Sequence, residues 1–115
     1  MIEYITRGYD MQRRVGDTIT SRHYYRDLSI MKEMETYPKD SVSIIMDCGV
    51  DDFVIEMNRA AHQKMVALKI PHEYIERPGK HDWPYWANAI QYQLFYFSNH
   101  FKSQAAKGKS ITKTN

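Results

Sequence analysis

Cysteine is nearly absent from this 115-residue sequence, in which Cys48 is the only one. A single cysteine excludes an internal disulfide and argues against a small secreted scaffold held together by disulfides. Long apolar runs are also missing, since none approaches the roughly 20 residues that a membrane-spanning helix needs. We therefore expect neither a disulfide framework nor a membrane partner.

Glycine is scarce as well, and its placement excludes one catalytic motif. The five glycines are Gly8, Gly16, Gly49, Gly79 and Gly108. No two of them have the spacing of a Gly-x-Ser-x-Gly nucleophile elbow, the turn that exposes the serine of an α/β-hydrolase. Flanking glycines are missing from every serine: Ser21, Ser29, Ser41, Ser43, Ser98, Ser103 and Ser110. The sequence thus offers no serine nucleophile of this type.

The composition is otherwise that of a globular protein. Apolar residues make up 43% of the chain, close to the usual share. Nine tyrosines, four phenylalanines and two tryptophans need apolar area to bury against. A packed core is therefore feasible, and wholesale disorder is not expected. The length suits one domain or part of one.

Basic residues gather at the C-terminal end. Residues 102–115 hold four lysines and no acidic residue, whereas residues 1–101 carry a small acidic excess. Because this end is polar and lacks periodicity, we expect residues 1–101 to form the folded part and residues 102–115 a flexible basic tail. Scattered lysines without interleaved aromatic residues are a poor nucleic-acid footprint, so no nucleic-acid partner is expected.

The hydrophobic pattern alternates between strands and helices. It predicts a helix over 21–34, a strand over 41–46, a helix over 54–69, a strand over 72–77 and a long helix over 83–101. Within the first helix, Ser29 is placed to cap a fresh turn. Residues 1–20 favour neither helix nor strand, although Gly16-Asp17 indicates an exposed turn.

These elements predict an α/β fold. The strand over 41–46 is apolar on both sides, as in a parallel sheet covered on both faces. The β-α-β-α order implies two parallel strands with a right-handed crossover. Two strands alone do not make a stable covered sheet. We therefore expect part of a larger sheet, with edges that favour a homo-oligomer.

The last predicted helix carries one clear apolar stripe. Its members recur at helical spacing: Trp83, Trp86, Ile90, Leu94, Phe97 and Phe101. We expect this stripe to be core or interface rather than part of a cofactor site. Further aromatic residues widen it beyond a single face. The helix therefore needs a larger apolar surface to pack against than this chain supplies.

Asp52 and His81 are the candidate catalytic residues. Each follows one of the predicted strands, at the carboxyl ends where open α/β sheets build their sites. In an α/β-hydrolase the triad follows the order Ser, Asp, His, and the acid orients the histidine that takes the serine proton. The interval between the two leaves room for one helix and one strand. The spacing thus fits the last two members of such a triad.

Residues 43–97 resemble the C-terminal part of a known enzyme family. The carrying motifs are Cys48-Gly49-Val50-Asp51-Asp52-Phe53, Asn58, His62, Ile70-Pro71-His72-Glu73-Tyr74, Pro78-Gly79-Lys80-His81-Asp82-Trp83 and Tyr85-Trp86. They are similar to those of the α/β-hydrolases that include esterase D and the tributyrin esterases. The resemblance implies a partial α/β-hydrolase fold over residues 1–101, with Asp52 as triad acid and His81 as general base.

The resemblance also implies a function for the whole enzyme. It indicates hydrolysis of short-chain acyl esters, with a small-molecule ester as substrate and no cofactor. Family members place their serine elbow upstream of the acid, and this sequence has none. We expect the chain to be inactive alone. The alternatives are a non-catalytic, self-associating interaction module, or half of an enzyme completed by another polypeptide.

Simpler interpretations stay open for the singled-out residues. Asp52 could cap the helix that follows it, and His81 could be a turn histidine bonded to a carbonyl. Cys48 and His62 fit structural roles better than catalytic ones. A metal site would have to use Asp51, Asp52, His72 and His81, which lack the spacing of a known metal motif. We therefore expect no metal.

Overall fold

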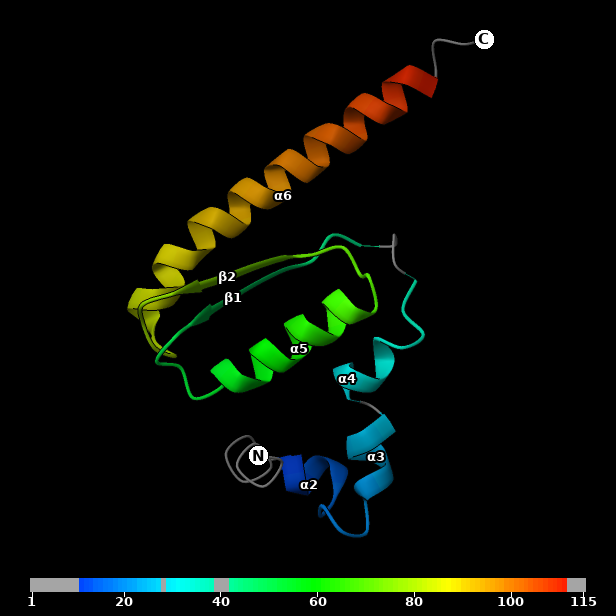
Figure 1. Ribbon diagram of the computed structural model, residues 1–115, viewed down its shortest axis with the longest axis vertical. Coiled ribbons are helices and arrows are strands. Elements are labelled where there is room, and N and C mark those ends of the chain that lie inside the picture. Colours follow the sequence, from blue (N-terminus) through cyan, green and yellow to red (C-terminus); the bar gives the residue numbers. More distant parts are fainter. Residues whose placement is uncertain (1–10, 28, 39–41, 112–115) are drawn as a thin grey trace. The chain divides into compact units, whose positions relative to one another are not determined.

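The computed structural model describes residues 11–27, 29–38 and 42–111 (Figure 1). The chain divides into two compact units, Met1–Pro38 and Lys39–Asn115. Residues 1–10, for which the sequence favoured no element, and the predicted start of the first strand at Ser41 lie outside the described residues. No helix of the described part is long and apolar enough to cross a membrane.

The described residues of the first unit form three short helices: α2 (Met11–Val15), α3 (Arg22–Asp27) and α4 (Ile30–Glu33). The helix predicted over 21–34 is thus two helices. The break occurs at Ser29, whose side chain accepts a hydrogen bond from the Met31 N–H at 3.3 Å and so caps α4. The capping role predicted for Ser29 is confirmed.

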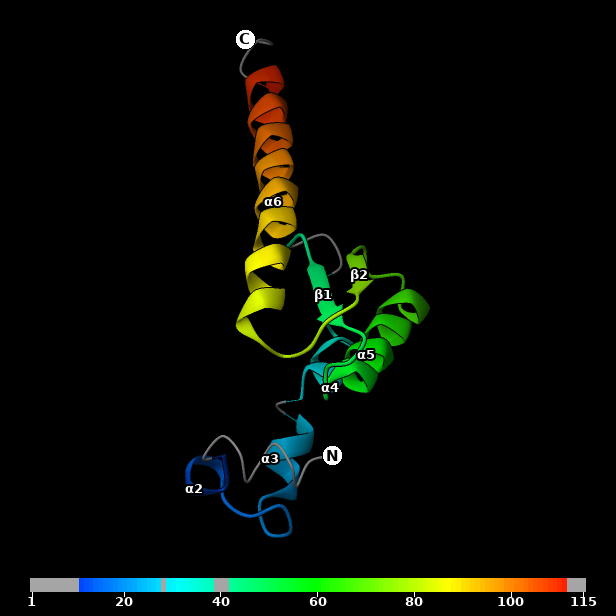
Figure 2. The same ribbon diagram turned by 90° about the vertical axis from the view of Figure 1, so that its left-hand side faces the viewer.

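The second unit holds β1 (Ile45–Gly49), α5 (Ile55–Ala67), β2 (Glu73–Arg77) and α6 (Trp83–Ile111). The two strands are parallel, with Ile45 opposite Glu73 and Gly49 opposite Arg77. α5 and α6 lie on opposite faces of this sheet, as both views show (Figures 1 and 2). The predicted β-α-β-α order and parallel pairing are confirmed.

The boundaries of β1 differ from the prediction. The paired segment begins at Ile45 rather than at Ser41, and it continues to Gly49. A strand exists only where its partner runs beside it, and the partner begins at Glu73, whose N–H donates to the Ile44 carbonyl at 2.9 Å. Val42, before the pairing starts, is 58% exposed.

Alternate residues of the strands face different helices. On the α5 face, Asn58 donates to the Cys48 thiol sulfur at 3.4 Å, and Arg59 pairs with Glu76 at 2.9 Å. On the α6 face, the Tyr85 hydroxyl donates to the Asp47 carboxylate at 2.5 Å. The period of two in a strand therefore assigns each side chain to one of the two layers.

α6 presents to the sheet a face other than the predicted one. Tyr85 and Ala89 are buried, at 7% and 3% exposure, whereas Trp83 and Leu94 of the predicted stripe are 79% and 62% exposed. Tyr96 also faces the sheet, since its hydroxyl donates to the Ile44 carbonyl at 3.0 Å. Of the two roles expected for the stripe, core or interface, the exposures exclude the core of the described residues.

α6 also extends further than predicted, through the expected tail to Ile111. Gln104, Ala105 and Ala106 are strong helix formers, and no proline interrupts them. The segment predicted as a flexible basic tail therefore includes the last turns of α6. Residues 112–115 lie outside the described part of the chain.

Candidate functional site

The loops that follow the carboxyl ends of β1 and β2 lie side by side. Their backbones are joined by two hydrogen bonds: the Val50 N–H donates to the Arg77 carbonyl at 2.9 Å, and the Asp51 N–H donates to the Gly79 carbonyl at 3.0 Å. These bonds continue the strand pairing past Gly49. The residues after each strand are therefore held next to one another, as the sequence analysis expected for the ends of parallel strands.

Two glycines allow this close approach. A Cβ atom on Gly49 would lie 2.2 Å from the Gly79 carbonyl oxygen, far inside contact distance. Gly79 has a φ of +140°, and a Cβ there would lie 2.5 Å from a ring carbon of Tyr85. Only glycine fits both positions, so the Gly49–Gly79 contact fixes the distance between the two loops.

Asp52 and His81 meet in these loops. The Asp52 Oδ2 lies 2.9 Å from the His81 Nδ1, and Asp52 is only 6% exposed. The other carboxylate oxygen, Oδ1, accepts the Val54 N–H at 3.0 Å. Because a carboxylate only accepts hydrogen bonds, Nδ1 carries the proton, and the Nε2 of neutral His81 is left with a lone pair. The imidazole is thereby oriented as a base.

Aromatic residues surround the His81 ring. Its centroid lies 4.9 Å from that of Phe53 and 5.0 Å from that of Trp86. Trp83 packs edge-on against Trp86 at 5.2 Å. The His81 side chain is 38% exposed, so the base lies at the surface inside a partly apolar rim. Another molecule can reach it there.

The structure also tests the simpler interpretations, in which Asp52 caps the following helix and His81 bonds to a carbonyl of its turn. Asp52 does accept a backbone N–H of the following turn, but the residue that caps α5 is Val54, which makes no side-chain cap bond. His81 bonds to a carboxylate rather than to a carbonyl of its own turn. Asp52 therefore holds the turn with one oxygen and the histidine with the other.

Cys48 is unsuited to act as a nucleophile. It is 3% exposed, and its sulfur accepts the Asn58 amide. Burial, with the negative charge of Asp52 as a second cause, raises the pKa of the thiol to about 11. Nucleophilic cysteines need a lowered pKa, so the structural role favoured by the sequence holds.

The remaining candidates do not join the pair. The described residues contain no cluster of three or more metal-ligating side chains. His72 instead bonds to His62, with 2.8 Å between Nε2 and Nδ1, and His62 stacks on Tyr74 at 4.2 Å. Asp51 contributes its backbone N–H to the loop contact.

A buried polar cluster that the sequence did not predict lies under α6. The Asp47 carboxylate, fully buried, accepts hydrogen bonds from Arg77 and Tyr85, and the Arg77 guanidinium also lies 4.0 Å from the ring centroid of Tyr92. Burial and the hydrogen bond to Asp47 raise the pKa of Tyr85 above its ordinary value. One feature of the sequence could have indicated this cluster, namely the acidic residue Asp47 inside an apolar strand. The cluster anchors α6 next to the loop that carries His81.

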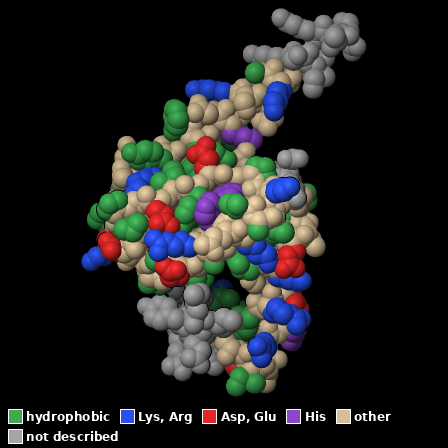
Figure 3. All heavy atoms as spheres, in the orientation of Figure 1, with side chains coloured by type: hydrophobic (Ala, Val, Ile, Leu, Met, Phe, Trp, Pro, Cys, Tyr) green, Lys and Arg blue, Asp and Glu red, His purple; other side chains and the backbone are tan. Residues whose placement is uncertain are grey.

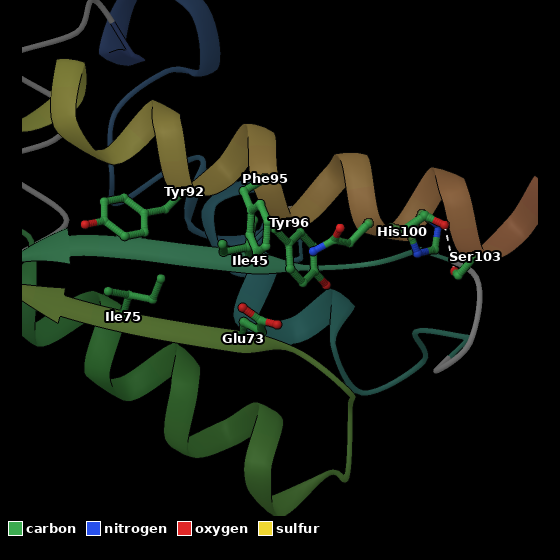
Figure 4. Close-up of a pocket in the computed structure, with 9 residues that line it drawn as sticks. Ile45, Glu73, Ile75, Tyr92, Phe95, Tyr96, His100 and Ser103 are labelled. Carbon is green, nitrogen blue, oxygen red and sulfur yellow. Dashed lines mark hydrogen bonds between the residues drawn. The ribbon is translucent and has the colours of Figure 1, made fainter.

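A pocket of about 390 Å³ lies at the other end of the strands, between the sheet and α6 (Figure 4). Its lining residues are Ile45, Glu73, Ile75, Tyr92, Phe95, Tyr96, Asn99, His100 and Ser103. Beside it, the Ser43 hydroxyl lies 2.6 Å from the His100 Nδ1. Neither Asp52 nor His81 lines this pocket, so we assign it no part in their chemistry.

Comparison with known proteins finds similarity among solved structures. No protein-family model and no curated protein matches the chain. Eight chains of solved structures do. Among them is a ferulic acid esterase, 34% identical over 58% of this chain and 27% of its own, with a TM-score of 0.51. The chain thus spans about a quarter of the length of that esterase.

This similarity is consistent with an esterase-like relationship and a partial α/β fold like that of a hydrolase. A buried carboxylate bonded to the Nδ1 of a histidine, at the ends of two parallel strands, is the geometry that orients a general base. The chemistry that this pair can perform is proton transfer at Nε2.

Proposed function

We propose that this chain is the acid–base part of a serine-type carboxylic ester hydrolase. The observation that carries the proposal is the 2.9 Å bond between Asp52 and His81, in which the acid is buried and the base reaches the surface. The similarity to a ferulic acid esterase supports the choice of an ester as substrate. Short-chain acyl esters are the substrate class we propose.

The roles of the two residues follow from the proton positions. His81 Nε2 accepts the proton of a serine hydroxyl as that oxygen attacks the ester carbonyl. Asp52 holds the ring through Nδ1 and stabilises the imidazolium that forms. The proton is then given to the leaving alcohol, and the acyl group stays on the serine oxygen. His81 next takes a proton from a water molecule, which attacks this acyl group and releases it as the carboxylic acid. No step needs a cofactor.

The serine, in this proposal, comes from outside these 115 residues. Among the described serines, none hydrogen-bonds to His81; Ser29 caps α4 and Ser43 bonds to His100. The match covers 27% of the ferulic acid esterase, so most of the length of that protein has no counterpart in these residues. Alone, the chain lacks a nucleophile elbow and should be inactive.

A mixing experiment tests the proposal. The ferulic acid esterase is produced without the segment that this chain matches, and it is mixed with this chain. Hydrolysis of a nitrophenyl butyrate should appear in the mixture and in neither component alone. His81→Gln and Asp52→Asn should lower that turnover by about 10³ to 10⁴, the range for loss of a triad member. An Asp51→Asn chain is the matched control, since only its backbone N–H serves the site.

Two results would contradict the proposal. Turnover that is unchanged by His81→Gln would remove the base from the reaction. A mixture that forms a complex but hydrolyses nothing would leave Asp52 and His81 without a catalytic role. The non-catalytic alternative, a self-associating module, is favoured by a separate observation on α6.

A further inference from the structure

α6 carries an exposed apolar stripe that no described residue of the second unit covers. We call it the α6 stripe. It comprises Trp83, Trp86, Ile90, Leu94, Phe97 and Phe101. Five of the six are more than one-third exposed, with values of 79% for Trp83, 62% for Leu94 and 66% for Phe101. Figure 3 shows hydrophobic side chains standing out along this helix and Lys side chains near its C-terminal end.

The stripe lies on a different side of the helix from the face that packs on the sheet. The buried residues Tyr85 and Ala89 define that face. At 100° per residue, the centre of the stripe lies roughly 120° from it. α6 is therefore apolar on two separate faces, and burial against the sheet uses only one. An exposed apolar patch of this kind marks an interaction site.

The spacing and charge of the stripe point to another helix as its partner. Its members follow one another at intervals of 3, 4, 4, 3 and 4 residues, which averages the 3.6 of a straight α-helix. The segment 83–101 contains no Asp, Glu, Lys or Arg. A helix that lies on a membrane surface usually has a strongly charged opposite face, which is missing here. A helix that packs against a neutral helix needs no such face.

We infer that the α6 stripe pairs antiparallel with the same stripe of a second copy of this chain. The stripe is close to self-complementary about its midpoint at position 92. In that arrangement Trp83 lies opposite the second copy's Phe101, and Ile90 lies opposite its Leu94. Across this two-fold axis, four of the six stripe residues therefore meet another stripe member, as an isologous interface requires, whereas Trp86 and Phe97 lie opposite Ser98 and Ala87.

Charge favours this direction over the parallel one. Beyond the stripe, Lys102 and Lys107 follow with no acidic residue on α6. Parallel pairing would set these lysines beside their own copies, and like charges repel. Antiparallel pairing about position 92 separates the two Lys102 residues by roughly 30 Å, three times the Debye length in 0.1 M salt. The repulsion is then largely screened.

The area is sufficient for an interface. From the exposed fractions of the stripe, each copy offers on the order of 600 Å² of side-chain surface, and the pair buries on the order of 1,200 Å². This is the lower end of the range for specific, stable interfaces. The dimer should therefore form at micromolar rather than nanomolar concentration. The inference stands independently of the proposed function, because it uses neither Asp52 nor His81.

Sedimentation of the full chain tests the inference. Between about 1 and 200 μM, the weight-average mass should rise from 13.7 kDa toward twice that value. Leu94→Glu places a charge at the centre of the stripe and should shift the dissociation constant at least about 10-fold. Phe95→Glu is the matched control: Phe95 is 69% exposed on the same helix, but it points away from the stripe. It should leave dimerisation unchanged.

Cross-linking tests the direction of pairing. A chain with Ile90→Cys mixed with a chain with Leu94→Cys should form the mixed disulfide faster than either forms its own. Cys48 does not interfere, because it is buried and burial raises its pKa to about 11. A mixture of the Ile90→Cys and Phe95→Cys chains is the control and should give little mixed product.

Each other result overturns the inference. A wild-type chain that stays monomeric at 200 μM has its stripe free or covered by its own residues. Association that survives Leu94→Glu uses another surface, such as the open edge of β1. Faster disulfide formation between two Ile90→Cys chains than in the mixture would show parallel pairing. Circular dichroism of both glutamate variants confirms that the helix is retained.

Discussion

Gly49→Ala should separate the acid from the base without touching either. The new Cβ would lie 2.2 Å from the Gly79 carbonyl oxygen and 2.6 Å from its carbon. Ordinary contact begins near 3.4 Å, so one loop has to move by about 1 Å. The obstacle is backbone, and side-chain rotation cannot relieve it. A shift of that size would stretch the 2.9 Å bond between Asp52 and His81 beyond hydrogen-bond range.

The magnitude follows from two losses. Overpacking typically costs about 1–3 kcal/mol, and loss of a hydrogen bond to a charged group costs about 1.5–3 kcal/mol. Because the movement that relieves the first causes the second, the two do not add. We expect a loss of about 2 kcal/mol in the free energy of unfolding, or about 10 °C in the melting temperature of a domain of this size.

Two measurements check this prediction. Thermal unfolding gives the change in stability, and nitrogen NMR of the His81 ring reports whether Nδ1 still carries the proton. Gly108→Ala is the matched control, since nothing lies within 4 Å of a Cβ at that helical position. It should leave the His81 ring unchanged and raise stability by up to about 1 kcal/mol. A Gly49→Ala chain with wild-type stability and an unchanged His81 ring would refute the contact as the basis of the site.

Three further predictions concern the polar contacts around the sheet. Asp47→Ala should destabilise the fold by about 3–5 kcal/mol, because it strands the largely buried Arg77, whereas Asp47→Leu with Arg77→Met should restore most of the stability in urea unfolding. The pKa of Glu76 is lowered to about 2, first by its hydrogen bond to Arg59 and then by that to Tyr74. This stabilisation is complete above the ordinary value near 4.5 and is lost as the pH falls toward 2, so Glu76→Gln should flatten the pH dependence of stability in that window. The Cys48 thiol should react with a thiol reagent at pH 8 only at the rate at which the chain opens, and fast labelling of the folded chain would contradict its burial.

Local patterns predicted most elements of the second unit. The helix predicted over 54–69 is α5 at Ile55–Ala67, where Lys69, with a φ of +56°, turns the chain away. The strand predicted over 72–77 is β2 at Glu73–Arg77. The spacing of hydrophobic residues is enough to predict these two elements, because each has one apolar face and a residue pattern that marks its end. The limits of β1 depended on where its partner strand begins, which no local pattern contains.

Hydrophobic periodicity alone could not predict which face of α6 packs on the sheet. The helix has one apolar face through Tyr85 and Ala89 and another through Trp83 and Leu94, and the sequence pattern ranks the second higher. The structure selects the first, because the Tyr85 hydroxyl reaches the buried Asp47 carboxylate. A specific polar contact thus outweighs general hydrophobicity in choosing between two apolar faces.

Part of the candidate site was foreseeable for a topological reason. Parallel strands bring the residues that follow them to one edge of the sheet, and this places Asp52 and His81 in adjoining loops. Their 2.9 Å separation requires more, namely the contact of Gly49 with Gly79. A glycine in a sequence does not reveal which other backbone it touches. That contact could be learned only from the structure.

The acid–base pair is organised by groups that lie between Gly49 and Trp86. The backbone joins the loops, Val54 holds one oxygen of Asp52, and the other oxygen orients His81. A nucleophile from outside has to approach the exposed side of that ring, past Trp86. Trp86 also belongs to the α6 stripe, so a completing polypeptide and a second copy of the chain would meet the same apolar surface. If both proposals hold, the two partners compete for this surface, so turnover per chain in the mixing experiment should fall as the concentration of this chain is raised into the range in which it dimerises.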